Sequence, residues 1–176
     1  MATQTTAVPV EEYLRTSYHP DREYVRGEVV ERNVGEYFHS MLQWLIIALL
    51  DSRWHERGFR IFPEQRIRVS DEPRYRIPDI SVKALPHDVT SILVCPDLVI
   101  EILSPDDEAG DMLEKIADYQ AAGIPHIWVI DPYKRRAGEA DGPHIRFSDN
   151  LILATPLVGE VDFAELFRRL DEPAIL

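Results

Sequence analysis

Residues 98–103 read Leu-Val-Ile-Glu-Ile-Leu, an apolar run that only Glu101 interrupts. A continuous apolar run of this length predicts a central β-strand that is covered on both faces. Residues 127–130, Ile-Trp-Val-Ile, predict another buried strand, and a helix of about four turns is predicted between the two. A strand, a helix and a strand in this order form a βαβ unit, so we expect the two strands to be parallel neighbours.

The helix between these strands is predicted to begin after Ser104-Pro105, where Asp106 or Asp107 can cap it. It is predicted to run to Ala122 and to end at Gly123. Its buried stripe is expected to consist of Met112, Leu113, Ile116 and Tyr119.

The rest of the chain predicts further strands and helices, and no repeat or linker divides it. Upstream, we expect a short helix at 9–16, a hairpin of 23–25 and 29–31 around Arg26-Gly27, a long helix at 35–57 closed by Gly58, and strands at 60–62, 65–69 and 77–82. Downstream, we expect strands at 145–147 and 151–154 and a short helix from Asp162 to Leu170. The sequence therefore predicts a single α/β domain over residues 1–176, with a mixed central sheet flanked by helices.

The composition limits the classes of protein and of partner. The chain has 176 residues, 19 Lys and Arg against 31 Asp and Glu, and a formal net charge of −12. This acidity excludes a protein that coats nucleic acid through its overall charge, because such binding depends on basic residues that release counterions. The longest apolar run, residues 44–50, is far shorter than the roughly 20 residues of a membrane span. Residues 1–10 lack the features of a signal peptide, and Cys95 is the single cysteine, so we expect a cytoplasmic protein without a membrane partner.

Two carboxylates stand in apolar strands, where an ionised group is costly unless it is paired or binds a metal. Glu101 lies within residues 98–103, and Asp79 lies within the predicted strand at 77–82. If the two strands are neighbours, both carboxylates can converge on one divalent cation, and Mg²⁺ is the natural candidate for such hard ligands. The alternative is that each carboxylate pairs with an arginine or caps a loop.

These residues belong to a wider pattern that can be compared with known families. It comprises Arg76-Ile77-Pro78-Asp79, Pro96 to Pro105, Asp111, Lys115, Tyr119, Ala122 to Pro125 and Trp128 to Pro132. Near the N-terminus the pattern includes Glu23, Gly27 and Glu28 of the predicted hairpin, and His39 near the start of the next predicted helix. Its departure in this region is Arg22, at a position where the family named next has tyrosine. From about Val10 to Asp131 the chain resembles the Uma-type endonuclease family, a domain of unknown function in the PD-(D/E)XK restriction-endonuclease-like superfamily.

The resemblance implies a metal-dependent phosphodiesterase in which Asp79 and Glu101 bind Mg²⁺ or Mn²⁺. In that superfamily a lysine normally follows the glutamate by two residues and orients the attacking water, but here Leu103 occupies that position. The family's Asp-x-x-x-Lys motif implies that Lys115 replaces it. The alternative for Lys115 is an exposed pair with Asp111 one helical turn away, worth only about 0.3–0.5 kcal/mol.

Several other polar residues are candidate accessory groups. Glu36, His39 and Gln43 share one helical stripe, so Glu36 or His39 could complete the metal shell through water, although His39 could instead form a structural hydrogen bond. Glu23 could reach the site from the hairpin or could simply hold an arginine. Candidate phosphate contacts, with solvated surface as the alternative, are Arg66, Arg68, Arg74 and Arg76.

Together, these observations predict a nuclease that hydrolyses phosphodiester bonds of nucleic acid, with DNA as the expected substrate. The superfamily resemblance implies a homodimer, since two strands require two cuts. Two other functions remain open. A nuclease scaffold that binds nucleic acid or a protein without cutting would fit Leu103 and the charge of −12, and a hydrolase of a smaller phosphoester would fit the acidic surface.

Overall fold

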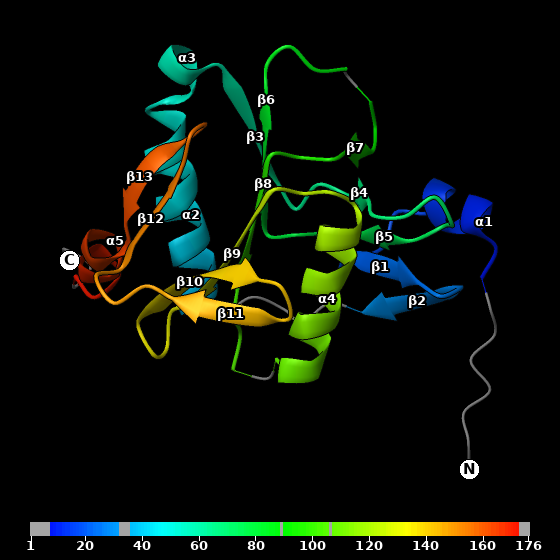
Figure 1. Cartoon of the computed structure of the whole chain (residues 1–176). Helices are drawn as coiled ribbons and strands as arrows, with labels where there is room; N and C mark the ends of the chain where they lie inside the picture. Colours follow the sequence, from blue (N-terminus) through cyan, green and yellow to red (C-terminus); the bar gives the residue numbers. More distant parts are fainter. Residues whose placement is uncertain (1–7, 32–35, 89, 106, 173–176) are drawn as a thin grey trace.

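The computed structural model describes residues 8–31, 36–88, 90–105 and 107–172, and Figure 1 traces the chain. The described helices are α1 (Val10–Arg15), α2 (Tyr37–Asp51), α3 (Trp54–Arg57), α4 (Ala109–Ala121) and α5 (Phe163–Leu170). The strands of the first half are β1 (Arg22–Val25), β2 (Glu28–Glu31), β3 (Phe59–Pro63), β4 (Ile67–Arg68), β5 (Tyr75–Arg76), β6 (Ile80–Ala84) and β7 (Leu93–Val94). Those of the second half are β8 (Leu98–Ile102), β9 (His126–Asp131), β10 (Arg136–Asp141), β11 (His144–Phe147), β12 (Ile152–Thr155) and β13 (Gly159–Asp162).

Among the described residues, the largest sheet has six strands in the order β11-β10-β9-β8-β6-β3. β8 and β9 run parallel and are joined by α4, which confirms the predicted βαβ unit. The other neighbours in this sheet are antiparallel, so the sheet is mixed. A smaller sheet, β2-β1-β5-β4-β7, lies beside it and contains the predicted hairpin. The fold is therefore α/β, as the sequence predicts.

The six-stranded sheet carries α2 on one face and α4 on the other, as Figure 1 shows. Successive side chains of a strand point to opposite faces, and β8 follows this rule. Leu98, Ile100 and Ile102 belong to the apolar core with α2 and α5, whereas Val99 belongs to the core with α4. β9 divides its side chains in the same way.

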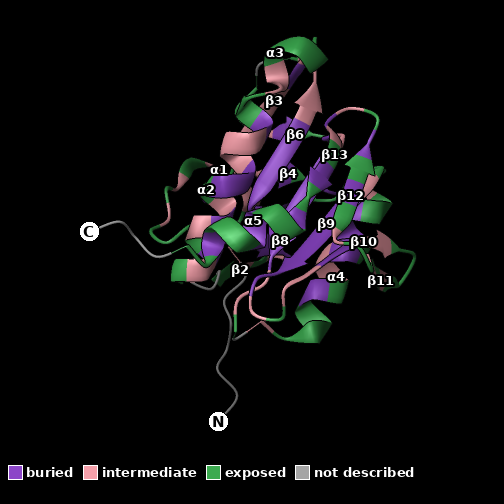
Figure 2. Cartoon of the chain, turned by 90° about the vertical axis from the view of Figure 1, so that its left-hand side faces the viewer, coloured by how far each residue is buried: buried purple, intermediate pink, exposed green. Residues whose placement is uncertain are grey.

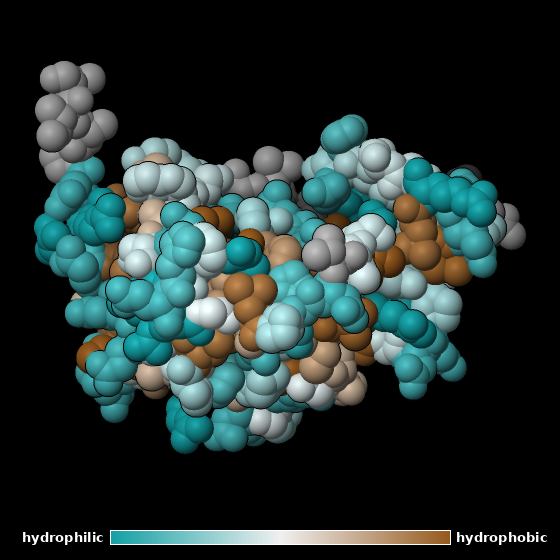
Figure 3. Space-filling model, turned by 90° about the horizontal axis from the view of Figure 1, so that it is seen from above, coloured by the Kyte–Doolittle hydropathy of each residue, from teal (hydrophilic) through white to brown (hydrophobic). Residues whose placement is uncertain are grey.

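The central strands β6, β8 and β9 of the large sheet are mostly buried, shown in purple in Figure 2, whereas the edge strand β11 and the outer faces of the helices are not. Every residue of β8 is buried, as expected for a central strand. Seen from above in Figure 3, the surface is mainly hydrophilic, with smaller hydrophobic groups between. Within the described ranges, no helix combines the length and apolar character needed to span a bilayer.

The prediction of one continuous helix over residues 35–57 is wrong. α2 ends at Asp51, and α3 begins at Trp54 and is closed by Gly58 in the left-handed conformation. At the break, the Ser52 hydroxyl donates to the carbonyl of Leu49, and such a local bond competes with the helical backbone. The Arg53 side chain adds a tertiary reason, because it donates to the carbonyls at positions 158 and 160. Gly35 lies outside the described residues.

The prediction of a strand over residues 77–82 is also wrong at its start. β5 ends at Arg76, and β6 begins only at Ile80. Pro78 explains the interruption, because it has no N–H to donate to a neighbouring strand. Asp79 thus stands at the entrance of β6 rather than within the strand, and its carbonyl accepts from the N–H of Glu64 at 3.1 Å.

The predicted cap of α4 is corrected as well. The helix begins at Ala109 with Glu108 at the N-cap position, and the Glu108 side chain forms no cap hydrogen bond. Asp107 precedes the cap, and its Oδ2 accepts instead from the backbone N–H of Ser104 at 2.7 Å. Asp106 lies outside the described residues.

The C-terminal part contains strands that the sequence pattern does not predict. β10 pairs with β9 and β11, and β13 pairs with β12. β10 reads Arg-Ala-Gly-Glu-Ala-Asp, which has neither the apolar content nor the β-branched residues of a typical strand. The predicted helix from Asp162 is confirmed as α5, with Asp162 as its N-cap.

Candidate functional site

Asp79 and Glu101 come together because of the alternation and the register of two neighbouring strands. In β8, the residues on either side of Glu101 face α2, so Glu101 faces α4. β6 pairs antiparallel with β8, with Ile80 opposite Ile100, which places Asp79 opposite Glu101. Both carboxylates are buried, with 3% and 2% of their surface exposed. The predicted convergence of these two side chains is thus reproduced by the geometry.

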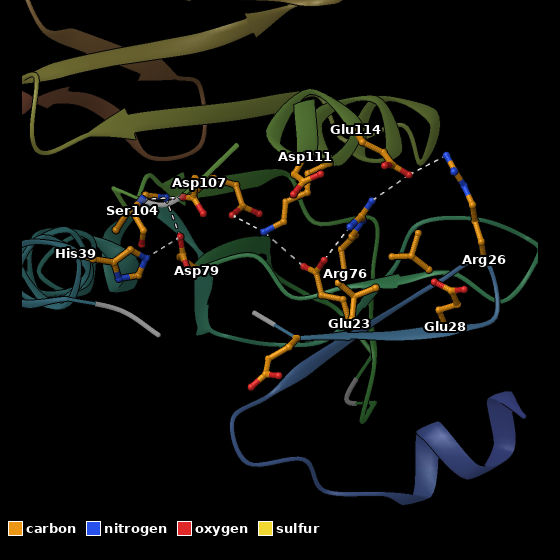
Figure 4. A pocket seen from close by; sticks show the side chains of 16 residues that line it. Glu23, Arg26, Glu28, His39, Arg76, Asp79, Ser104, Asp107, Asp111 and Glu114 are labelled. Atoms are coloured by element: carbon orange, nitrogen blue, oxygen red, sulfur yellow. Dashed lines mark hydrogen bonds and ion pairs between the residues drawn. The ribbon is translucent and has the colours of Figure 1, made fainter. Parts of the chain in front are cut away.

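The two carboxylates lie at the base of a cleft of about 470 Å³, which Figure 4 shows from close by. Side chains from the β1–β2 hairpin, the start of α2, the end of β8 and one face of α4 line the cleft. Segments far apart in the sequence therefore share one cavity, and each contributes polar groups to it.

The Asp79 carboxylate is held by the backbone of β8 and by α2. Its Oδ2 accepts from the backbone N–H of Ile102 at 2.7 Å and lies 3.2 Å from Nε2 of His39. The side chain of Gln43, one turn further along α2, donates to the Asp79 carbonyl at 2.9 Å. These contacts fix the orientation of the carboxylate before any ligand binds.

The Glu101 carboxylate is held by α4. Its Oε1 accepts a short hydrogen bond from the Tyr119 hydroxyl, and its Oε2 lies 3.5 Å from Nζ of Lys115. Burial raises the pKa of Glu101 to about 7; the Lys115 ammonium opposes this rise, and the negative charge of Asp79 adds to it. A second positive charge beside this carboxylate would therefore be strongly favourable.

Lys115 reaches the site from α4, although Leu103 occupies the position after β8 where the superfamily pattern has its lysine. The ammonium lies 3.5 Å from Glu101 and 3.6 Å from Oε1 of Glu23. Leu103 instead packs against the apolar core beneath α4. The geometry thus brings Lys115 to the buried carboxylates, and its surroundings extend beyond an exposed helical pair with Asp111.

Glu23 comes from β1 and connects the hairpin to the site. Its Oε1 accepts from the N–H of Ile77 at 3.1 Å, and its Oε2 forms an ion pair of 2.8 Å with Arg76. Burial alone would raise the pKa of Glu23, but the charges of Lys115 and Arg76 outweigh burial and hold it below its ordinary value. Glu23 is therefore an ionised partner of both Lys115 and Arg76.

The candidate phosphate contacts divide into one arginine in the cleft and three elsewhere. Arg76 lines the cleft but is buried between Glu23 and Asp118. Arg74 pairs with Asp118 and Glu114 on the outer side of the same network. Arg66 and Arg68 do not line the cleft. The Arg66 guanidinium carbon lies 4.3 Å from the centre of the Tyr13 ring, and the Arg68 side chain donates to the carbonyls at positions 70 and 71. The structure therefore does not bring Arg66, Arg68 or Arg74 into the cleft.

The two candidates at the start of α2, Glu36 and His39, also lie in different surroundings. His39 lines the cleft beside Asp79. Glu36 is exposed, and its Oε2 accepts from the Tyr133 hydroxyl at 3.3 Å, which turns it towards the loop after β9. Of the two candidates for completing a metal shell, the geometry retains His39.

Sequence reasoning missed the polar role of Tyr119 and the contribution of Arg26. Tyr119 was expected in the buried stripe of α4 and as part of the family pattern, without a polar role, yet its hydroxyl orients Glu101. Its position one turn after Lys115 was the available signal, because residues at this spacing share a helical face. Arg26 lines the cleft at the hairpin turn and pairs with Glu114 of α4 at 3.0 Å. Nothing in the sequence indicates that contact, since 88 residues separate the partners.

The donor set at the base of the cleft fits a hard divalent cation. Within the described part of the chain, no group of three or more His, Cys, Asp and Glu side chains is arranged to hold a metal by itself. Mg²⁺ does not require such a cage, because one or two carboxylates with waters and phosphate oxygens usually hold it. Asp79 and Glu101 supply two carboxylates whose mutual repulsion a cation would relieve. The residues present therefore suit this ion.

The fold of this chain matches that of a solved structure. The chain is similar to a protein described as a putative nuclease belonging to DUF820 from Anabaena variabilis, with 23% sequence identity and a TM-score of 0.80. The similarity covers 93% of this chain and 99% of that one, which confirms the expected fold. The model of the Uma2 family, described as Putative restriction endonuclease, matches residues 10–138. The chain therefore belongs to the Uma2 family, as its sequence resemblance indicated. No curated protein matches the chain.

Proposed function

We propose that this protein is a metal-dependent nuclease that hydrolyses phosphodiester bonds of DNA. The observation that carries the proposal is the pair of buried carboxylates on neighbouring strands, Asp79 and Glu101, with the Lys115 ammonium 3.5 Å from one of them. Membership of the Uma2 family, described as Putative restriction endonuclease, supports the reaction class.

Asp79 and Glu101 would hold a Mg²⁺ or Mn²⁺ ion at the base of the cleft. When bound, such an ion supplies Lewis acidity toward the phosphoryl oxygens and lowers the pKa of a water that attacks phosphorus. The protein's own contribution is to keep both carboxylates oriented. The Ile102 N–H and His39 do this for Asp79, and Tyr119 does it for Glu101.

Lys115 is the proposed positioning group for the nucleophile. Its ammonium stands at the base of the cleft, next to where a phosphodiester must lie to meet Asp79 and Glu101. A fixed positive charge there stabilises the negative charge that develops during phosphoryl transfer. Glu23 holds the ammonium from the opposite side, at 3.6 Å.

A hydrolase of a smaller phosphoester is a second candidate, favoured by the acidity of the cleft. Eight of the described lining side chains are carboxylates and only three are basic. A long polyanion is repelled by such a lining more strongly than a small diester is. The non-cutting scaffold is disfavoured because the Lys115 ammonium lies beside Glu101 and can replace the lysine that is missing at position 103. Single-domain organisation and the homodimer remain predictions.

The proposal is tested by measuring cleavage of labelled DNA oligonucleotides and of a small chromogenic phosphodiester, each with Mg²⁺, Mn²⁺ or EDTA. We expect the wild type to cut DNA only with a cation, and Asp79→Asn and Glu101→Gln to lose about a thousandfold in rate. Glu160→Gln, an exposed carboxylate outside the cleft, is the matched control.

Each other outcome has a definite meaning. Equal cleavage by the carboxylate variants would show that the activity does not belong to this site. Hydrolysis of the small diester without cleavage of DNA would establish the second candidate. Cation binding that depends on both carboxylates, without hydrolysis of any substrate, would establish a non-cutting scaffold.

A further inference from the structure

The charges around the cleft restrict what can enter it. A bound cation would offset Asp79 and Glu101, and Arg76 and Lys115 already offset Glu23. The rim still carries further carboxylates, among them Glu28 and Glu31 on the hairpin and Asp107 and Asp111 on or before α4. The rim is therefore negative on both walls, and a substrate with a high density of negative charge is repelled there.

The two walls of the cleft are tied together on one side. Arg26, at the turn of the β1–β2 hairpin, pairs with Glu114 of α4 at 3.0 Å. Figure 4 shows this ion pair running from the hairpin to the helix. Glu114 also binds Arg74 at 3.0 Å, so the helix is anchored to the smaller sheet at the same place. The hairpin and α4 consequently stand only side-chain lengths apart where this bridge crosses.

The size and depth of the cleft add a second restriction. Its volume of about 470 Å³ lies within the range of cavities that hold a small ligand. Asp79 and Glu101 have 3% and 2% of their surface exposed, so a phosphodiester must enter the cleft to reach them. A duplex is a stiff rod with a persistence length of about 150 bp, so bringing one phosphate inward requires a costly distortion of the neighbouring base pairs.

We propose that the cleft accepts a single nucleic-acid strand and excludes the intact duplex, an inference that rests on the proposed nuclease function. A single strand carries one charge per roughly 3.4 Å, half the charge density of a duplex, so the acidic rim repels it less. It is also flexible enough to place one phosphodiester at the base of the cleft. Single-stranded DNA, single-stranded RNA and unpaired strand ends all share this chemistry. A site of this kind needs one copy of the chain for each cut.

The test compares one labelled sequence as single-stranded DNA, as single-stranded RNA, as a blunt duplex and as a duplex with an unpaired tail. Cleavage is measured with Mn²⁺, and binding is measured by fluorescence anisotropy with Ca²⁺ in place of Mn²⁺. We expect the single strand and the tail to be cut at least about tenfold faster than paired regions, with a similar preference in binding. The DNA and RNA arms identify the strand that is used.

Failure of this inference can be told apart from failure of the proposed function. Duplex cleavage at the rate of the single strand would overturn the inference and leave the nuclease standing. If no oligonucleotide is cut, the nuclease proposal fails and binding decides the inference. Tighter binding of the single strand then supports it, and equal or tighter binding of the duplex overturns it.

Charge variants of the rim test the physical reason. Glu28→Gln combined with Asp111→Asn removes one exposed carboxylate from each wall. We expect this variant to bind duplex several-fold better, which narrows the preference for the single strand. The matched control, Glu56→Gln with Glu72→Gln, removes the same charge from exposed positions outside the cleft. An identical change in both double variants would show that net charge alone, rather than the rim, sets the preference.

Discussion

The α2 face and the α4 face of the six-stranded sheet are built from the same strands but from different side chains. Towards α2, β8 presents Leu98, Ile100 and Ile102 to an apolar core that includes Trp128 of β9 and Phe163 of α5. Towards α4, the same strand presents the apolar Val99 and then the charged Glu101. Because side chains alternate along β8, its α2 face serves apolar packing and its α4 face carries a charged group of the candidate site.

This difference between the two faces indicates where stability and function can be changed independently. The α2 face holds the layers together through apolar contacts. The α4 face contains buried carboxylates that repel one another and are balanced by Lys115 and Arg76. Changes on the first face should alter the free energy of unfolding, and changes on the second should alter activity and its pH dependence.

The largest effect on stability is expected for Phe163→Ala on the α2 face. Phe163 is fully buried and packs edge-to-face on Trp128 with ring centroids 6.0 Å apart. Its truncation leaves a cavity, which costs about 3–5 kcal/mol in the free energy of unfolding. Denaturant unfolding measures this loss, and the cleavage rate per folded molecule should not change. Leu113→Ala, at an exposed apolar position of α4, is the control. A Phe163→Ala protein of normal stability would contradict the role assigned to this face.

The next effect is expected for Lys115→Met on the α4 face. Loss of the ammonium should lower the cleavage rate about 100-fold, the lower range for a positioned catalytic group. Because Lys115 opposes the raised pKa of Glu101, the rise of rate with pH should also move to higher pH. Rate–pH profiles of the two proteins measure both changes. A rate within about twofold of wild type and an unshifted profile would exclude Lys115 from the reaction.

The pH dependence of stability should reveal Glu101 directly. In the folded protein its pKa is raised from 4.5 to about 7, so between these values the folded state holds a proton that the unfolded chain releases. The free energy of unfolding should therefore fall as pH rises from 4.5 to 7, by on the order of 2–3 kcal/mol relative to Glu101→Gln. Glu23, whose pKa is lowered, loses its contribution only as pH falls below its ordinary value. If the free energy of unfolding changed equally with pH in the wild type and in Glu101→Gln between pH 4.5 and 7, the burial argument would be contradicted.

The smallest effect is expected for Asp162→Ala at the start of α5. The carboxylate accepts from the N–H groups of Ala164 and Glu165 at 2.9 and 3.3 Å. Loss of this cap should cost about 1 kcal/mol in the free energy of unfolding. Denaturant unfolding measures it, and Asp162→Asn should recover most of the loss. Equal destabilisation by both substitutions would show that the carboxylate acts in some other way than as a cap.

The central βαβ unit and the paired carboxylates could be predicted because their signals are local. The apolar run of β8, the glutamate within it and most of the buried stripe of α4 are visible within a few turns of chain. The prediction is wrong for Leu113, which was placed in that stripe and is exposed. The end of α2 was not predictable in this way, unlike the interruption before β6, for which Pro78 is a local signal. The end of α2 depends partly on Arg53 contacts with carbonyls more than 100 residues away.

The partners of the charged residues were equally hidden from sequence reasoning. Arg76 was a candidate phosphate contact, with solvated surface as the alternative, but it pairs with Glu23 and Asp118, at sequence separations of 53 and 42. Tyr119 was expected in the buried stripe and in the family pattern, but its contact with Glu101 was not predicted, because periodicity predicts which face a side chain occupies and not which polar atom its hydroxyl meets. Secondary structure near the site was therefore more predictable than its hydrogen bonds.

The most direct measurement of the central claim is Mn²⁺ binding by titration calorimetry to the wild type, Asp79→Asn, Glu101→Gln and the control Glu160→Gln. The account predicts that the wild type and the control bind the ion alike, whereas both site variants lose at least about tenfold to 100-fold in affinity. It also predicts that the site variants remain folded, with melting temperatures no lower than that of the wild type. Equal Mn²⁺ affinity in all four proteins would contradict the assignment of Asp79 and Glu101 as the metal ligands.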